Sequence, residues 1–179
     1  MTEERTENIS IDDVLIEPMT IADYSDVRAL WMTIRGFGIR ALDDSREDIE
    51  RFIARNPTTS VVARVSGKIV GSILCGSDGR QGALYHVCVA REDRRRGIGT
   101  RMVGTCMQRL KEMGINKVSL IAFTRNDAGN AFWKQIGWTR KADVNYYEFL
   151  LNEANITEFI GEEDEHNEDH GRRDGSEGL

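Results

Sequence analysis

Residues 87–100 combine residue types that suit the binding of a phosphate group. Residues 87–90 are almost wholly apolar, and basic residues and glycines then open a long helical pattern: Arg94, Arg95, Arg96, Gly97, Gly99 and Thr100. The first N–H groups of a helix have no intrahelical partner, and the helix dipole favours negative charge there. Glycines let a phosphate approach the backbone, while arginines and a threonine hydroxyl add donors. These residues predict a pyrophosphate site.

Other interpretations of the same segment can be weighed. Two glycines and three arginines also make an ordinary exposed turn, and the residues alone do not decide between the turn and the anion site. The segment has no Gly-x-Gly-x-x-Gly followed by an acid placed for a ribose, which argues against a dinucleotide site. It also lacks a Gly-Lys-Ser/Thr ending, which argues against a P-loop.

Two motifs in the chain resemble those of a known family. The pattern Arg94-x-x-Gly97-x-Gly99, after the strand pattern Val87-x-Val89, resembles the acyl-CoA signature of the GNAT superfamily of N-acyltransferases. The later stretch Asn126-x-x-Gly129-x-x-Phe132-Trp133-x-x-x-Gly137-Trp138 resembles the second motif of that family, which usually reads Asn-x-x-Ala-x-x-Leu/Phe-Tyr-x-x-x-Gly-Phe. The resemblance covers about residues 14–151, and two spaced motifs are more specific than either alone.

The resemblance implies a fold and a co-substrate. The fold is α/β, with a mixed, mostly antiparallel sheet of about six to seven strands, a splayed central parallel pair (83–90 and 118–123) and about four helices. Acetyl-CoA would lie in the wedge between the splayed strands, its pantetheine arm along residues 87 and 89 and its pyrophosphate on the N–H groups of residues 95–100. The implied cofactor-binding residues are Val87, Cys88, Val89, Arg94, Arg95, Arg96, Gly97, Ile98, Gly99, Thr100, Asn126 and Trp133.

The chemistry that the resemblance implies is direct attack of an amine on the thioester. This reaction needs a route for the amine proton, polarisation of the carbonyl and an acid for the departing thiolate. Many family members use a tyrosine where this chain has Trp133, whose indole N–H is not a useful acid. Three outcomes stay open: Trp133 only packs against the cofactor and water protonates the thiolate, another residue is the acid, or the protein binds acyl-CoA with little catalysis.

Tyr85 is the first candidate for a replacement acid. Because strand side chains alternate, Tyr85 and Val87 are expected on one face and His86 and Cys88 on the other. In the family the face that holds Tyr85 carries catalytic side chains, although a core tyrosine is an equal alternative. The same alternation turns His86 away from the wedge, which favours a structural role for it. Cys88 has no adjacent base, which disfavours a covalent cysteine mechanism.

The glycine-broken stretch 35–44, called the acceptor loop below, lies where family members shape the acceptor pocket. Phe37 could pack on a substrate, and Arg35 or Arg40 could hold a carboxylate, which would suit a small amine that bears an acid group or a peptide end. A flexible solvated loop is the ordinary alternative. One of Tyr146 and Tyr147 could also lie near the substrate.

The elements that position these residues follow from hydrophobic periodicity and cap residues. Strands are expected at 14–16, 60–65, 69–75, 83–90, 118–123 and 146–151. Helices are expected from Thr20 to about residue 34, from Ser45 to residue 55, at 98–113 and at 126–136. We expect one domain, residues 14–160, between an acidic extension at 1–13 and an acidic, disordered tail at 161–179.

Composition limits the other classes of function. The net charge is −6, yet both ends are acidic and the body between them is basic, which favours an anionic ligand. No run of eighteen apolar residues, no apolar signal segment and no basic surface interleaved with aromatics is present, so we expect no membrane or nucleic-acid partner. Three cysteines in apolar stretches indicate reduced thiols in the cytoplasm. No metal site is expected, although His166 and His170 could hold a metal weakly if helical; a solvated tail is favoured.

The sequence therefore predicts an N-acetyltransferase that moves an acetyl group from acetyl-CoA to a primary amine, on a small molecule, an amino acid, or a protein N-terminus or lysine. The alternative from another class is a catalytically weak acyl-CoA sensor or interaction module, because of Trp133. A third idea is an enzyme for bulkier acyl groups. Homodimers are frequent among proteins of this kind, so a homodimer also stays open.

Overall fold

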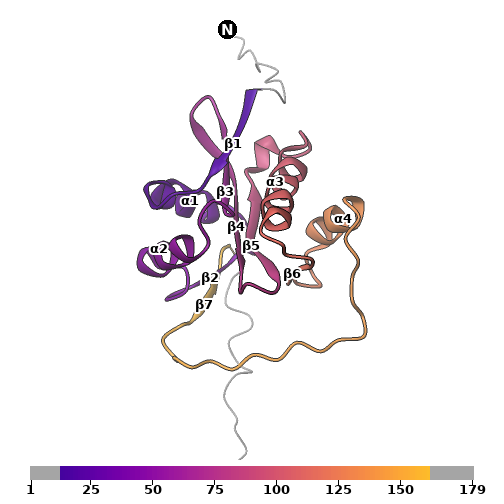
Figure 1. Cartoon of the computed structure of the whole chain (residues 1–179). Helices are drawn as coiled ribbons and strands as arrows, with labels where there is room; N and C mark the ends of the chain where they lie inside the picture. Colours follow the sequence, from indigo (N-terminus) through magenta and orange to yellow (C-terminus); the bar gives the residue numbers. More distant parts are fainter. Residues whose placement is uncertain (1–12, 162–179) are drawn as a thin grey trace, which may run out of the picture.

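The computed structural model describes residues 13–161, which contain a five-stranded sheet of order β1-β3-β4-β5-β6 (Figure 1). All neighbouring strands are antiparallel except β5 and β6, which are parallel because α3 connects them as a crossover helix. The predicted α/β class with a mixed, mostly antiparallel sheet is confirmed. The strands are β1 (Val14–Pro18), β3 (Val61–Val65), β4 (Lys68–Ser77), β5 (Gly82–Val89) and β6 (Val118–Leu120).

Residues 13–161 contain four α-helices, as predicted. Helices α1 (Tyr24–Trp31) and α2 (Arg46–Arg55) lie on one face of the sheet and α3 (Ile98–Glu112) lies on the other, while α4 (Asp127–Gln135) lies beside α3 near the β6 edge (Figure 1). Single 3₁₀ turns precede α1 (Ile21–Asp23) and α3 (Arg91–Asp93). The predicted cap Ser45 starts α2, where its hydroxyl accepts a hydrogen bond from the Asp48 amide at 3.3 Å.

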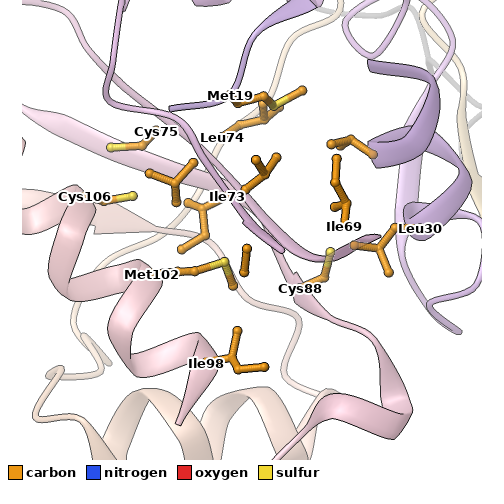
Figure 2. Close-up of a cluster of buried hydrophobic side chains, with 14 of the residues drawn as sticks. Met19, Leu30, Ile69, Ile73, Leu74, Cys75, Cys88, Ile98, Met102 and Cys106 are labelled. Atoms are coloured by element: carbon orange, nitrogen blue, oxygen red, sulfur yellow. The ribbon is translucent and has the colours of Figure 1, made fainter. Parts of the chain in front are cut away.

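The hydrophobic core lies on both sides of the sheet. Figure 2 shows Leu30 of α1 on one side and Ile98, Met102 and Cys106 along α3 on the other. A Cβ at Gly71 of β4 would lie 2.8 Å from Met102 Cε, so glycine at residue 71 leaves room for the Met102 side chain of α3 against the sheet. The core thus fixes α3, whose first turn carries the predicted anion site.

A second, two-stranded sheet joins the acceptor loop to a later part of the chain. Strand β2 (Gly38–Arg40) pairs antiparallel with β7 (Thr157–Phe159). The pairing continues beyond the strands, because the Ile160 amide donates to the Phe37 carbonyl at 3.0 Å. Neither strand was predicted from the sequence, and together they hold half of the expected loop in a fixed conformation.

The predicted strand at residues 146–151 is wrong. This stretch has no regular structure, and its side chains are exposed, 85% for Tyr147 and 96% for Leu151. After α4 the chain leaves the sheet and runs past its lower end to reach β7 (orange in Figure 1). Apolar alternation favours a strand, but a strand needs a neighbour, and this path brings none beside it. As a result β6 is an edge strand, and the parallel pair lies at one side of the sheet instead of its centre.

The two predicted acidic extensions, 1–13 and 161–179, lie outside the described residues except for Asp13 and Gly161, and so do His166 and His170. Within residues 13–161, no helix is both long enough and apolar enough to cross a membrane. The same residues contain no group of three or more His, Cys, Asp or Glu side chains that could hold a metal ion.

Candidate active site

Strands β5 and β6 pair only over the first three residues of each strand. Their pairing joins Gly82–Leu84 to Val118–Leu120, where β6 ends, while β5 continues to Val89 beside β4. Among the described residues, residues 85–89 of β5 therefore have one backbone edge, on the β6 side, that pairs with no strand. An extended chain that carries its own amide groups fits such an edge by strand addition.

The turn between β5 and α3 has the backbone conformation of an anion site. Arg95 and Gly97 are both left-handed, with φ of 62° and 76°, and Gly97 is the N-cap residue of the 15-residue helix α3. Left-handed residues in such a turn bring successive N–H groups to one side, where they form a concave anion site at the positive end of the helix dipole. Only glycine adopts the conformation at residue 97 without strain.

The three arginines of this turn differ in their surroundings. The Arg94 guanidinium donates through Nε to the Val89 carbonyl at 3.0 Å, which fixes its stem across the end of β5. Arg96 forms an ion pair with Asp93 at 2.5 Å. A buried carboxylate thus already neutralises part of the charge at Arg96, while Arg94 keeps its NH1 and NH2 groups for another acceptor.

Gly99 has a packing role that sequence reasoning did not assign to it. A Cβ at this position would lie 3.3 Å from Phe132 Cζ of α4 and 3.8 Å from Val89 Cγ2. Glycine at residue 99 therefore lets α4 pack against the first turn of α3. The two sequence motifs meet at this contact.

Helix α4 explains several residues of the second motif. Asn126 is its N-cap, and its side-chain oxygen accepts a hydrogen bond from the Gly129 amide at 2.9 Å. At the other end Gly137 is left-handed, with φ of 89°, and the Trp138 amide donates to the Trp133 carbonyl at 2.9 Å. This is a Schellman ending, and the two indole rings form its hydrophobic contact at 5.0 Å between centroids. Trp133 is half-buried against Trp138 and Phe132.

A β-bulge reorients the side chains of β5. Tyr85 pairs with Leu74 and Cys88 pairs with Ser72, so β5 has one more residue than β4 over this interval, and His86 is left-handed with φ of 49°. Tyr85 packs edge-on against Phe52 of α2, with ring centroids 6.0 Å apart, and His86 lies against Trp31 of α1 at 4.5 Å. Both rings therefore face the α1 and α2 side. The prediction that Tyr85 and His86 lie on opposite faces of the sheet is wrong. The extra residue of the bulge interrupts the alternation, so two neighbouring side chains lie on the same face.

His86 is joined to the end of the acceptor loop. Its Nε2 lies 2.6 Å from Asp44 Oδ1, and the Asp44 side chain is only 5% exposed. The other carboxylate oxygen of Asp44 accepts a hydrogen bond from the Arg40 amide at 2.7 Å. Phe37 of the same loop lies 4.9 Å from the imidazole centroid. Sequence reasoning missed Asp44, because nothing in the local pattern shows that the bulge turns His86 toward it.

The predicted acceptor residues are only partly brought together. Phe37 lies beside His86, whereas Arg35 is exposed with its stem near Gly161, the last described residue. Arg40 forms ion pairs with Asp43 at 3.8 Å and with Glu148 at 3.4 Å. Two carboxylates thus surround Arg40, which weakens the expectation that it holds the carboxylate of a substrate.

Two tyrosines lie near this face. Tyr85 is 47% exposed, so its hydroxyl is not sealed in the core. The Tyr146 hydroxyl donates to Glu148 at 3.0 Å, and this hydrogen bond to a carboxylate raises the pKa of Tyr146. The irregular segment after α4 therefore contributes polar groups beside the acceptor loop.

Cys88 has the environment of an inert thiol. Its Sγ is buried and lies 3.4 Å from the Ser72 hydroxyl, which also accepts a hydrogen bond from Trp31 Nε1 at 2.9 Å. Burial raises the pKa of the Cys88 thiol to about 11. The thiol is therefore neutral at physiological pH, which argues against a covalent cysteine mechanism.

The sequence is similar to those of known proteins. The family model for the acetyltransferase (GNAT) family matches residues 26–138. An acetyltransferase of Sodalis glossinidius is 32% identical over 122 residues, which cover 68% of this chain and 84% of that protein.

Two solved structures have the same fold. An N-acetyltransferase of Thermoplasma acidophilum in complex with coenzyme A superposes with a TM-score of 0.60 at 16% identity, covering 69% of this chain and 88% of that one. The aminoglycoside N-acetyltransferase AAC(6')-Iy, with a bisubstrate analogue of CoA and acetylneamine, superposes with a TM-score of 0.62 at 15% identity, covering 76% and 98%. The chain described here belongs to the acetyltransferase (GNAT) family and is an acyltransferase.

Proposed function

We propose that this protein transfers an acetyl group from acetyl-CoA to a primary amine. One observation carries the proposal: the backbone edge of β5 beyond Leu84, which pairs with no strand in the described residues, leads directly into the left-handed turn at Arg95 and Gly97. The pantetheine arm fits along Val87 and Val89 as an added strand, and the pyrophosphate fits the N–H groups of residues 95–100. Arg94 adds a fixed cation at the junction between the two.

The acceptor side of the proposal rests on the α1 and α2 face. The acetyl group would lie where β5 and β6 part, next to Tyr85 and His86, and the acceptor loop covers this region through Phe37 and Asp44. The neighbour bound to a CoA–acetylneamine analogue supports an amine as the acceptor. A small molecule, an amino acid, and a protein N-terminus or lysine all remain within the proposal.

A second candidate function is an acyl-CoA sensor with little catalysis. The observation that favours it is Trp133, which occupies the position of the usual acid and is packed into the Schellman contact with Trp138. We propose a cytoplasmic location for either function. The three cysteines support it, because all of them are buried free thiols.

The proposal is tested by measuring thiol release from acetyl-CoA across a panel of amines, amino acids and peptides, beside the affinity of acetyl-CoA measured by calorimetry. We expect turnover on at least one primary amine. Arg94→Ala should weaken acetyl-CoA binding by about tenfold, the loss of one charge-assisted contact, whereas Arg55→Ala on the exposed end of α2 should not. Tight acetyl-CoA binding without turnover on any acceptor would contradict the enzymatic function and favour the sensor.

A further inference from the structure

His86, which is partly exposed, contacts the buried Asp44 at the end of the acceptor loop, two residues beyond the point where β5 stops pairing with β6. We propose that His86 is the general base that removes the proton of the acceptor ammonium, and that Asp44 is the positioning residue that fixes the ring. This inference rests on the proposed function and deepens it, because it names the group that prepares the amine for attack.

The hydrogen bonds around Asp44 decide which imidazole nitrogen can accept a proton. Asp44 Oδ1 lies 2.6 Å from His86 Nε2, and Oδ2 is held by the Arg40 amide at 2.7 Å. A carboxylate accepts hydrogen bonds, so Nε2 carries the hydrogen and Nδ1 of the neutral ring is left with a lone pair. The same arrangement stabilises the imidazolium after proton transfer, since its positive charge faces a carboxylate that is 5% exposed.

The imidazole ring lies close to the point where β5 and β6 stop pairing, which is where the acetyl group is proposed to lie. His86 follows Leu84, the last residue of β5 that pairs with β6, by two positions. Its imidazole lies between the rings of Trp31 and Phe37, at 4.5 Å and 4.9 Å between centroids, and its side chain is 17% exposed. The aromatic rings restrict the imidazole to one orientation but leave part of it accessible to an acceptor.

The bulge brings the Tyr85 and His86 side chains to the same face of the sheet, the one covered by α1 and α2. Without the extra residue, Tyr85 and His86 would face opposite layers; with it, both face α1 and α2. A left-handed conformation at a residue other than glycine is uncommon and costs free energy, and it is typical of functional sites. Two further groups contact Asp44: the Tyr24 hydroxyl donates to its backbone carbonyl at 2.9 Å, and the Arg40 amide of β2 donates to its Oδ2 at 2.7 Å.

The proposed step conserves atoms and charge. The acceptor ammonium gives one proton to His86 Nδ1, and the neutral amine nitrogen then forms the C–N bond to the acetyl carbon while the C–S bond breaks. The sulfur leaves with the bonding electron pair and takes a second proton, which comes from the new amide nitrogen directly or through the Tyr85 hydroxyl. His86 later releases its proton to water, so the net products are the amide, the free thiol and one proton.

Two substitutions at residue 86 test the base without disturbing the bulge, since asparagine and glycine both tolerate a left-handed backbone. His86→Asn keeps a residue that tolerates the left-handed backbone but removes both the base and the ring nitrogen that contacts Asp44, and we expect kcat to fall by about 100-fold with unchanged affinity for acetyl-CoA. His86→Gly leaves a space between Trp31 and Phe37, and added imidazole should restore part of its turnover but not that of His86→Asn. A His86→Asn enzyme that retains kcat within about threefold would overturn the proposal.

The tautomer of His86 provides a readout that needs no acceptor. Nitrogen-15 NMR of the full chain, with His86→Asn to assign the signal, should show hydrogen on Nε2 and none on Nδ1 in the neutral ring. Asp44→Asn allows the new amide to donate to Nε2, so it should move the hydrogen to Nδ1 and lower kcat about as far as His86→Asn does. Hydrogen on Nδ1 in the wild type would overturn the proposal.

The same experiments separate this inference from the proposed function. A wild-type enzyme without turnover on any amine contradicts the proposed function. Turnover in the wild type together with undiminished turnover in His86→Asn contradicts only the role of His86.

Discussion

The Trp133 and Trp138 rings lie 5.0 Å apart across the end of α4, and the Trp138 amide donates to the Trp133 carbonyl at 2.9 Å. Trp133 is thus part of the motif that ends the helix, as well as the residue at the position where related enzymes have an acid. The packing accounts for a large aromatic ring at residue 133. In the proposed transfer, another group would therefore protonate the leaving thiolate.

Trp133→Tyr separates these two roles. A tyrosine ring keeps part of the contact with Trp138, so we expect a loss of about 1 kcal/mol in the free energy of unfolding, measured by urea denaturation. Turnover should change by no more than about threefold if Tyr85 or water protonates the thiolate. A gain of tenfold or more would instead show that the missing tyrosine limits catalysis and would favour the sensor function.

Gly97→Ala tests the anion site through its backbone. A Cβ at φ of 76° costs about 1–2 kcal/mol, and relief of this strain would turn the N–H groups of residues 95–100 away from a common point. We therefore expect weaker acetyl-CoA binding by calorimetry together with a lower melting temperature.

Gly104→Ala is the matched control in the same helix. Gly104 lies in the middle of α3, and a Cβ there would meet nothing within 4 Å. This variant should gain about 0.5–1 kcal/mol in stability and keep its affinity for acetyl-CoA. Equal affinities in Gly97→Ala and Gly104→Ala would contradict the proposed pyrophosphate site.

Tyr85→Phe tests the candidate acid. Loss of a proton donor beside the leaving sulfur should lower kcat by at least about tenfold without loss of acetyl-CoA affinity, as steady-state kinetics and calorimetry can measure. Tyr147→Phe is the control, because Tyr147 is 85% exposed on the irregular segment after α4. If both variants keep the kcat of the wild type, water is the proton source and Tyr85 is a packing residue.

The burial of Cys88 predicts a loss of stability at high pH. Its thiol pKa is raised from 9.0 to about 11 in the folded protein, so above pH 9 the unfolded chain loses a proton that the folded chain retains. The difference between the two thiol pKa values contributes about 2–3 kcal/mol to the free energy of unfolding. This contribution is complete below pH 9 and is lost progressively as the pH rises toward 11.

Urea denaturation between pH 8 and about pH 10.5 measures this loss. The pKa of Cys106 is also raised, through its hydrogen bond with Cys75 and through burial, so the wild type has two contributions of the same sign. Cys88→Ala should reduce the pH dependence without abolishing it. The same slope in both proteins would contradict the assigned environment of Cys88.

Local patterns were sufficient to predict the elements that we propose to hold the co-substrate. The apolar strand 83–90, the helical spacing of 98–113 and the cap at Asn126 all depend on neighbours in sequence, and all agree with the structure within a few residues. Gly97 was singled out because glycine lets a phosphate approach the backbone, and the structure adds that residue 97 is left-handed, with φ of 76°.

The acceptor side depends on contacts between distant residues and was predicted poorly. The bulge that turns His86 toward Asp44 comes from one extra residue in β5 relative to β4, which no alternation within β5 can show. Strand β7 has the short sequence Thr-Glu-Phe and exists because it pairs with Gly38–Arg40, more than a hundred residues earlier. Residues 146–151 have strand-like alternation but no partner strand.

The most direct test of the acetyltransferase function is to follow an isotopically labelled acetyl group from acetyl-CoA by mass spectrometry, with the wild-type protein and a panel of primary amines. We predict that the label appears in an amide of at least one amine, with an equal amount of free CoA, and that Arg94→Ala forms less of it at low acetyl-CoA concentration. Label that stays on CoA with every amine, while calorimetry shows that acetyl-CoA is bound, would contradict the function proposed for this protein.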